Sequence, residues 1–231
     1  MISDQYKCIF VHIPKAAGKS VEHFFLNLHG LSWNDRAPLL LRPNPDPEKG
    51  PQRLAHLKAT EYMDCGYVDE KTFEDYFKFT FVRNPWSRLV SEYRYRDYHK
   101  KMSFRDFVFN GLPEESSYTD AYRHIVPQYD FLYDSAGNQL VDFVGKFETI
   151  QKDFDQVCAQ LNIADSHLSH VNSSSFKTYV KESLEKIKRL VLFQGKKKRY
   201  PYTDLYDHET IAAVEKMYEK DIDTFKYSFG E

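Results

Sequence analysis

The chain has 231 residues, of which 42% are hydrophobic and 29% charged, and its formal net charge is −2. A chain of this length and composition buries a substantial core, so we expect a single domain over residues 1–231. The nearly balanced charge excludes the polycationic surface typical of nucleic-acid binding. Any anionic ligand must therefore be held by a local cluster of residues.

Cysteine usage and hydropathy indicate the compartment. The three cysteines, Cys8, Cys65 and Cys158, are widely spaced, which favours buried thiols in a reducing compartment over a disulfide framework. No apolar run approaches the roughly 18 residues of a membrane span, and the first residues lack the apolar core of a signal peptide. We expect a soluble, cytoplasmic chain, and the sequence leaves its oligomeric state open.

The segment Lys7–Ser20 predicts a phosphate-binding loop. Cys8–Val11 is a short run of β-branched and aromatic residues typical of a buried strand. The pattern breaks at Pro14, and a helix is expected from Lys19. A tight loop between a strand and a helix directs unpaired N–H groups and the positive end of the helix dipole to one point, which attracts an anion. The residues expected to contact phosphate are Pro14, Lys15, Ala16, Ala17, Gly18, Lys19 and Ser20.

The loop departs from the common phosphate-loop pattern. Gly18-Lys19-Ser20 matches the end of GxxxxGK[ST], but Ile13 stands where the pattern has its first glycine. Lys15 adds a cation in the middle of the loop. The alternative interpretation is an ordinary turn between a strand and a helix.

Hydrophobic spacing predicts the remaining elements. Further strands are expected over residues 54–57, 77–82 and 141–144, and helices over residues 21–28, 69–76, 87–101, 103–111, 150–161, 179–192 and 207–218. Five prolines between Trp33 and Gln52 exclude a regular element there. The alternation of strands and helices favours a parallel sheet with right-handed crossovers. We therefore expect an α/β, P-loop-like three-layer fold with a central parallel sheet flanked by helices.

A second anion site is expected where the strand over residues 77–82 ends. Ligands gather at the carboxyl ends of parallel strands, so Arg83 is expected to face the same crevice as Lys15. Arg88 follows, and Ser91 lies two helical turns beyond Arg83. A guanidinium and a hydroxyl suit a bidentate phosphate contact, although Arg83 could instead pair with a glutamate.

The strand that precedes Arg83 does not end in a carboxylate that could hold Mg²⁺. The sequence also shows no cluster with metal-ligand spacing, so no metal site is expected. Two anion sites without a metal favour a nucleotide that carries phosphates at two positions.

The segments IPKAAGKS and FTFVRNPWSRLVSEYRY resemble the two signature motifs of sulfotransferases that use 3′-phosphoadenosine 5′-phosphosulfate. The chain is most similar to the carbohydrate branch that includes heparan-sulfate 2-O- and chondroitin-type enzymes. Further similarity lies in HLKATEY, HIVPQYDFLYD, VDFVGKFETIQKDF, HVNSS and YTDLYDHETIAAVEKMYEKDIDTFKY. The resemblance spans nearly the whole chain, but it is interrupted over residues 176–198 by an inserted charged segment.

The resemblance implies a role for each predicted anion site. Pro14–Ser20 is expected to wrap the 5′-phosphosulfate, with Lys15 on the bridging oxygen. Arg83 and Ser91 match the residues that hold the 3′-phosphate. Sulfuryl transfer of this kind depends on charge stabilisation at the departing oxygen and on an in-line acceptor.

The resemblance also implies a base for the acceptor hydroxyl. His56 corresponds to the catalytic histidine of the family, and a neutral imidazole suits proton abstraction near pH 7. Glu61 is expected to orient His56 and to lie on the substrate side, and His124 is expected to contact the substrate. The alternative for His56 is a hydrogen-bonded core histidine, and His12 is expected to be structural.

Two predictions concern the region after residue 170. Asn172 and Ser173 are expected to line the nucleotide pocket, with a helix cap as the alternative. The basic run Lys196–Arg199 is expected to be a lid over the donor or the acceptor, with a solvated charge run as the alternative.

These features predict a sulfotransferase that moves a sulfuryl group from 3′-phosphoadenosine 5′-phosphosulfate to a hydroxyl of a carbohydrate. The enzyme alternative is a P-loop kinase that uses Mg-ATP. A second alternative is a non-catalytic module that binds a nucleotide or polyanion. The sequence does not identify the acceptor.

Overall fold

The computed structural model describes residues 1–116, 118–169 and 201–231. Its strands are β1 (Ile2–Ser3), β2 (Cys8–Val11), β3 (Phe77–Val82) and β4 (Phe143–Lys146). The helices within the described ranges are α1 (Gly18–Leu28), α2 (Glu61–Asp64), α3 (Glu70–Asp75), α4 (Pro85–Tyr95), α5 (Phe104–Asn110), α6 (Asp120–Arg123), α7 (Tyr129–Leu132), α8 (Ile150–Gln160), α10 (His208–Met217) and α11 (Glu219–Phe225). The predictions for Asn172, Ser173, the helix over 179–192 and the basic run Lys196–Arg199 lie outside the described residues.

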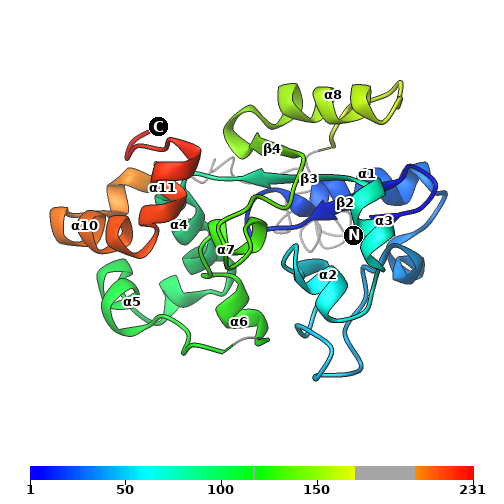
Figure 1. The fold of residues 1–231 in the computed structure, drawn as a ribbon. Helices are drawn as coiled ribbons and strands as arrows, with labels where there is room; N and C mark the ends of the chain where they lie inside the picture. The colour runs from blue at the N-terminus through cyan, green and yellow to red at the C-terminus, as the bar shows by residue number, and fades with distance from the viewer. Residues whose placement is uncertain (117, 170–200) are drawn as a thin grey trace, which may run out of the picture.

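The four strands form one sheet in the order β1-β2-β3-β4 (Figure 1). Strands β2, β3 and β4 are parallel, with Phe10 opposite Phe79 and Phe79 opposite Phe143. Strand β1 runs antiparallel to β2. The α/β fold with a central parallel sheet is therefore confirmed. Strand β1 adds an antiparallel edge, because β1 and β2 are joined by a short turn that reverses the chain.

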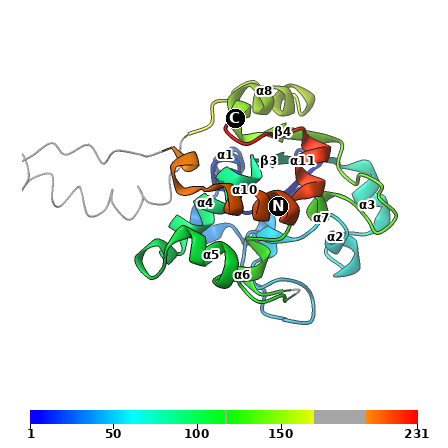
Figure 2. The same ribbon diagram turned by 90° about the vertical axis from the view of Figure 1, so that its left-hand side faces the viewer.

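Helices cover both faces of the sheet, which gives three layers. Because successive side chains of a strand point to opposite faces, β2 contributes to two separate cores. Phe10 packs in the cluster that contains residues of α1 and α8, and Ile9 and Val11 pack in the cluster that contains residues of α4, α5 and α7. In Figures 1 and 2, α8 lies above the sheet and α5 and α6 lie below it.

Three of the expected elements differ from the structure. The strand expected over 54–57 is a 3₁₀ turn, Leu54–His56, in which the N–H of His56 donates to the carbonyl oxygen of Arg53 at 2.9 Å. The strand expected over 141–144 lies two residues later. The helix expected over 87–101 ends at Tyr95, because Asp97 has a left-handed φ of 60°.

The short helices α2, α6, α7 and α11 were not predicted. Three of them have only four residues, too few for a hydrophobic period to be visible in the sequence.

Within the described residues, no helix combines the length and the apolar character needed to cross a membrane. The three cysteines are all free thiols. Cys8 and Cys158 are buried and Cys65 is half-buried, as expected from their wide spacing.

The start of α4 holds the end of β3 in place. Asn84 is its N-cap and Pro85 its first residue, and the Asn84 side chain accepts a hydrogen bond from the Ser87 N–H at 3.2 Å. The buried Asn84 amide also donates to the carbonyl oxygen of Ser228 at 2.9 Å. One side chain thus fixes both the helix start and the C-terminal segment.

We predict that Asn84→Ala lowers the free energy of unfolding by about 2–3 kcal/mol, because it removes a helix cap and also the hydrogen bond that ties this buried side chain to the carbonyl oxygen of Ser228. The control is Ser103→Ala, which removes the N-cap of α5 at a solvent-exposed site and should lower it by only about 1 kcal/mol. Urea denaturation measures both. Equal losses would show that Asn84 acts as a cap alone.

Candidate active site

The loop between β2 and α1 has the backbone geometry of an anion site. Lys15 and Ala17 have left-handed φ values of 70° and 65°, and no side chain caps the N-terminus of α1. A Cβ at Gly18 would lie 2.0 Å from the His12 ring, so this position requires glycine. The first N–H groups of an 11-residue helix therefore open toward the loop, where the helix dipole favours an anion.

Two arginines, Arg83 after β3 and Arg88 in α4, donate hydrogen bonds to backbone carbonyl oxygens of the loop. Arg83 Nη1 donates to the carbonyl oxygen of Lys15 at 3.2 Å, and Arg88 Nε donates to that of Pro14 at 3.1 Å. Arg88 is fully buried and also donates to the carbonyl oxygen of His124 at 3.0 Å. Arg83 and the loop thus lie together, as predicted, whereas Arg88 has a structural role.

Arg83 is held at both its backbone and its side chain. Its N–H donates to Gln128 Oε1 at 2.8 Å, and Gln128 Nε2 donates back to its carbonyl oxygen at 2.8 Å. Its guanidinium donates to Ser87 Oγ from Nε and Nη2, and it lies 4.2 Å from the ring centroid of Phe147. Ser91 is half-buried one helical turn beyond Ser87, on the same face of α4.

Lys15 is half-buried, and this position disfavours its positive charge. Its Nζ is 3.7 Å from the ring centroid of Tyr95. Burial lowers the pKa of Lys15 to about 8, with the nearby Arg83 acting in the same direction and Glu92 opposing it. An anion bound in the loop stabilises the charged form of this lysine.

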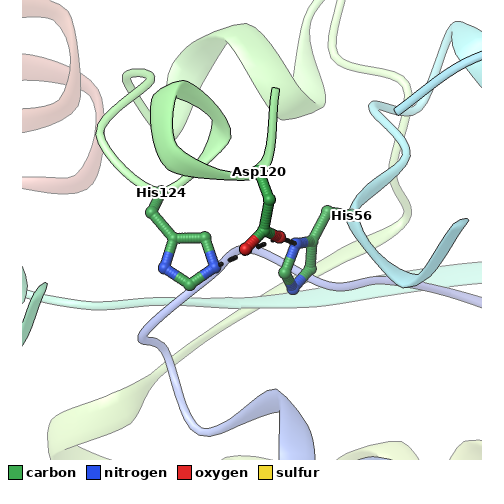
Figure 3. A group of neighbouring side chains, drawn as sticks. All are labelled: His56, Asp120 and His124. Atoms are coloured by element: carbon green, nitrogen blue, oxygen red, sulfur yellow. Dashed lines mark ion pairs between the residues drawn. The ribbon is translucent and has the colours of Figure 1, made fainter. Parts of the chain in front are cut away.

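His56 lies in a buried cluster with Asp120 and His124 (Figure 3). His56 Nδ1 lies 3.3 Å from Asp120 Oδ1, and His124 Nε2 lies 3.7 Å from the same oxygen. The His56 ring is also 5.0 Å from that of His12, which stands beside Gly18. The cluster therefore adjoins the loop.

Helix α4 holds this cluster. His124 Nδ1 lies 2.6 Å from Glu92 Oε2, and Arg96 contacts both Glu92 and Asp120, donating from Nη2 to Asp120 Oδ2 at 2.8 Å. Tyr95 stacks on the His124 ring, and its own ring also makes the cation–π contact with Lys15.

The charge states in the cluster follow from burial and pairing. Burial lowers the pKa of His56 to about 3, although its contact with Asp120 opposes the shift. Burial also lowers the pKa of His124. At Asp120, burial acts to raise the pKa, but His56, His124 and Arg53 hold the pKa of this carboxyl below its usual range. Near pH 7 the site therefore holds two neutral imidazoles and one carboxylate.

Glu61 does not orient His56. One of its oxygens contacts Arg123, and the other accepts the Lys58 N–H at 2.8 Å. Asp120 occupies the place beside His56 that the sequence indicated for Glu61. His12, which was expected to be structural, has its Nδ1 2.5 Å from Glu22 Oε1.

Sequence reasoning missed Asp120, Glu92 and Arg96. The only local signals were the i, i+4 spacings of Glu92 with Arg96 and of Asp120 with His124, which place each pair on one helical face. These signals do not show that the two pairs meet. A groove of about 830 Å³ beside α7, lined in part by Lys58, Tyr129 and Lys220, contains neither His56 nor the loop.

We predict that Arg88→Met lowers the free energy of unfolding by about 2–4 kcal/mol, because two buried carbonyl oxygens, of Pro14 and His124, lose a charged donor. The control is Arg94→Met on the exposed face of α4, which should change it by less than about 0.5 kcal/mol. Thermal and urea denaturation measure both, and a stable Arg88→Met variant would contradict the supporting role.

The chain was compared with known proteins. The model of the Sulfotransferase family matches residues 1–228. An uncharacterized protein of Archaeoglobus fulgidus is 28% identical over 127 residues, covering 52% of this chain and 96% of that protein. No solved structure matches the chain significantly.

Carbohydrate sulfotransferase 14 of Mus musculus and that of Homo sapiens are each 24% identical over 191 residues, covering 68% of this chain and 45% of theirs. The chain therefore spans less than half the length of these curated relatives. Because the family model matches nearly every residue, the chain belongs to the Sulfotransferase family, with weak homology to its carbohydrate branch.

Proposed function

We propose that the chain transfers a sulfuryl group from 3′-phosphoadenosine 5′-phosphosulfate to a hydroxyl of a carbohydrate, with His56 as the general base. The family supports sulfuryl transfer. The observation that carries the finer proposal is the adjacency of a cationic loop and a buried neutral histidine, joined through Lys15, Tyr95 and His124.

The loop residues fit an anionic donor. Pro14–Ser20 offers left-handed backbone turns and an uncapped helix start. Its glycine has no Cβ, which leaves room for the His12 ring beside the loop. Lys15 would place its ammonium on the oxygen that departs from sulfur, where negative charge develops. Arg83 and Ser91 would hold the 3′-phosphate. Asn172 and Ser173 stay predictions for the same pocket.

His56 is suited to take the proton of the acceptor. With the Nδ1 proton directed at the Asp120 carboxylate, Nε2 presents a lone pair, and no described residue makes a hydrogen bond to it. In the transfer, the acceptor oxygen bonds to sulfur as the bond from sulfur to the phosphate oxygen breaks, and the acceptor proton passes to Nε2. Asp120 then faces the imidazolium that forms, which its charge stabilises.

The proposal of a carbohydrate acceptor is based on the names of the curated relatives. The two curated mammalian relatives are named carbohydrate sulfotransferases, and we propose a sugar hydroxyl as the acceptor here. His124 is proposed to contact it. Because both oxygens of Glu61 are already engaged, we give Glu61 no part in the transfer.

We further propose that the chain is one domain and works in the cytoplasm. The family match over residues 1–228 supports one domain. The free thiols support a reducing compartment.

The test is a transfer assay with labelled donor and a panel of glycans and phenols. We predict that Lys15→Ala and Arg83→Ala abolish transfer and that Arg83→Ala also weakens binding of adenosine 3′,5′-bisphosphate. His56→Ala should lower turnover by about 10²–10⁴-fold and still bind that nucleotide. His208→Ala, at an exposed position on α10, is the matched control. Unchanged turnover in His56→Ala would remove His56 from the mechanism.

The pH dependence gives a second prediction. Because the pKa of His56 is about 3, its neutral, active form persists through acid pH, and kcat/KM should not fall between pH 7 and pH 5. Because the pKa of Lys15 is about 8, kcat/KM should fall above pH 8 as the ammonium loses its proton. Lys15→Arg keeps its charge at that pH, so any residual activity should lack the alkaline fall. A decline beginning at pH 6.5 would contradict the charge state of His56.

A further inference from the structure

Three buried atoms converge without a hydrogen-bond partner. They are His56 Nδ1, Asp120 Oδ1 and His124 Nε2, and they lie within 4.8 Å of one another (Figure 3). Both imidazoles are at least nine-tenths buried. Buried polar atoms in folded proteins are almost always hydrogen-bonded. Asp120 Oδ1 has 3.3 Å ion-pair contacts with His56 Nδ1 and Arg53 Nε, but none of the three atoms makes a hydrogen bond, which indicates a missing partner.

The tautomer of His124 shows what kind of partner is missing. Its Nδ1 lies 2.6 Å from a Glu92 oxygen, so the ring proton belongs on Nδ1. Nε2 then directs a lone pair at Asp120 Oδ1, 3.7 Å away, which also carries only lone pairs. Two acceptors that face each other in a buried site are stabilised by a cation between them.

The donor atoms have the spacing of a transition-metal site. Metal–nitrogen and metal–oxygen bonds of about 2.0–2.2 Å in a tetrahedron place the ligand atoms about 3.4 Å apart. The two separations from Asp120 Oδ1 are 3.3 and 3.7 Å, and the two imidazole nitrogens lie within 4.8 Å of each other. The surrounding contacts also fit. Glu92 holds the second nitrogen of His124, and Arg96 holds the second oxygen of Asp120, as outer partners orient metal ligands elsewhere.

We propose that His56 Nδ1, Asp120 Oδ1 and His124 Nε2 bind one divalent transition-metal ion, such as Zn²⁺, and that the bound ion inhibits the enzyme. Two imidazoles and one carboxylate suit Zn²⁺, Co²⁺ or Ni²⁺ rather than Mg²⁺. The inhibition rests on the proposed function of His56, whereas the binding does not. Coordination at Nδ1 moves the ring proton of His56 to Nε2, so the ring keeps its charge but loses the lone pair that would accept the proton of the acceptor.

Nearby cations limit the affinity of this site. Arg53 Nε lies 3.3 Å from Asp120 Oδ1, the oxygen that the metal requires. The Arg53 side chain is 48% exposed, so it can turn into solvent when the metal binds. Arg96 and Lys15 add positive charge, and Glu92 and Asp120 offset it.

The binding test uses calorimetric titration with Zn²⁺ and the visible absorption of bound Co²⁺. The wild type should bind one ion. Asp120→Asn and His124→Gln should each weaken binding by more than about 100-fold, and Glu92→Gln by about 10–100-fold, the range for outer partners. His208→Gln is the matched control and should bind like the wild type.

A gain-of-binding variant keeps the test valid if a ligand variant fails to fold. Arg53→Gln removes a competing cation at a partly exposed position, so it should bind Zn²⁺ more tightly than the wild type. X-ray absorption of the wild type with Co²⁺ should show two imidazole ligands. Absence of stoichiometric binding to the wild type, or equal binding in Asp120→Asn, would overturn the site.

A transfer assay separates this site from the proposed function. Zn²⁺ at a concentration that fills the proposed metal site should stop transfer by the wild type, and a chelator should restore transfer fully. If Zn²⁺ binds at these three residues while transfer continues unchanged, the metal site stands and the role of His56 as base is wrong. If transfer is lost in His56→Ala but no metal binds, the base stands and the metal site is wrong.

Discussion

The site depends on one contact between two parts of the chain that are far apart in sequence: the hydrogen bonds from Arg83 and Arg88 to the carbonyl oxygens of Lys15 and Pro14. A loop with two left-handed residues is strained, and these bonds hold it against the end of β3. Arg83 is in turn fixed by Gln128, whose own N–H donates to the buried Asp221. Contacts within the chain thus define the shape of the loop, which lowers the cost of ordering it when a ligand binds.

The same packing places a positively charged loop beside a cluster of neutral histidines. Burial, together with the neighbouring positive charges, lowers the pKa of Lys15 in the loop, while burial keeps two histidines of the neighbouring cluster neutral. Glu92 and Arg96 lie between the two regions. They hold His124 and Asp120 by direct contacts. Because Glu92 and Arg96 carry opposite charges, they add no net charge between the two regions. This arrangement is the one that the proposed donor site and the proposed base require.

Much of the fold and half of the site could be predicted from the sequence, because the signals were local. The apolar runs at β2 and β3 and the Asn84-Pro85 helix start each depend on neighbouring residues alone. Lys15 and Arg83 were placed together because parallel strands end at one edge of a sheet. The turn around His56 was predicted as a strand, since a short apolar run does not distinguish a strand from a 3₁₀ turn. Asp120 was missed for another reason: it lies 64 positions from His56, and long-range contacts such as those of Arg96 with Asp120 and of Glu92 with His124 bring it there.

The proposed donor site predicts that the chain binds a nucleotide with phosphates at two positions and needs no metal to do so. Calorimetry with adenosine 3′,5′-bisphosphate, 5′-AMP and Mg-ATP tests this most directly. One charge-assisted contact to the 3′-phosphate contributes about 1.5–3 kcal/mol, so the bisphosphate should bind in the presence of a chelator at least about 10-fold more tightly than 5′-AMP. Tighter binding of Mg-ATP, lost when the chelator is added, would contradict the account.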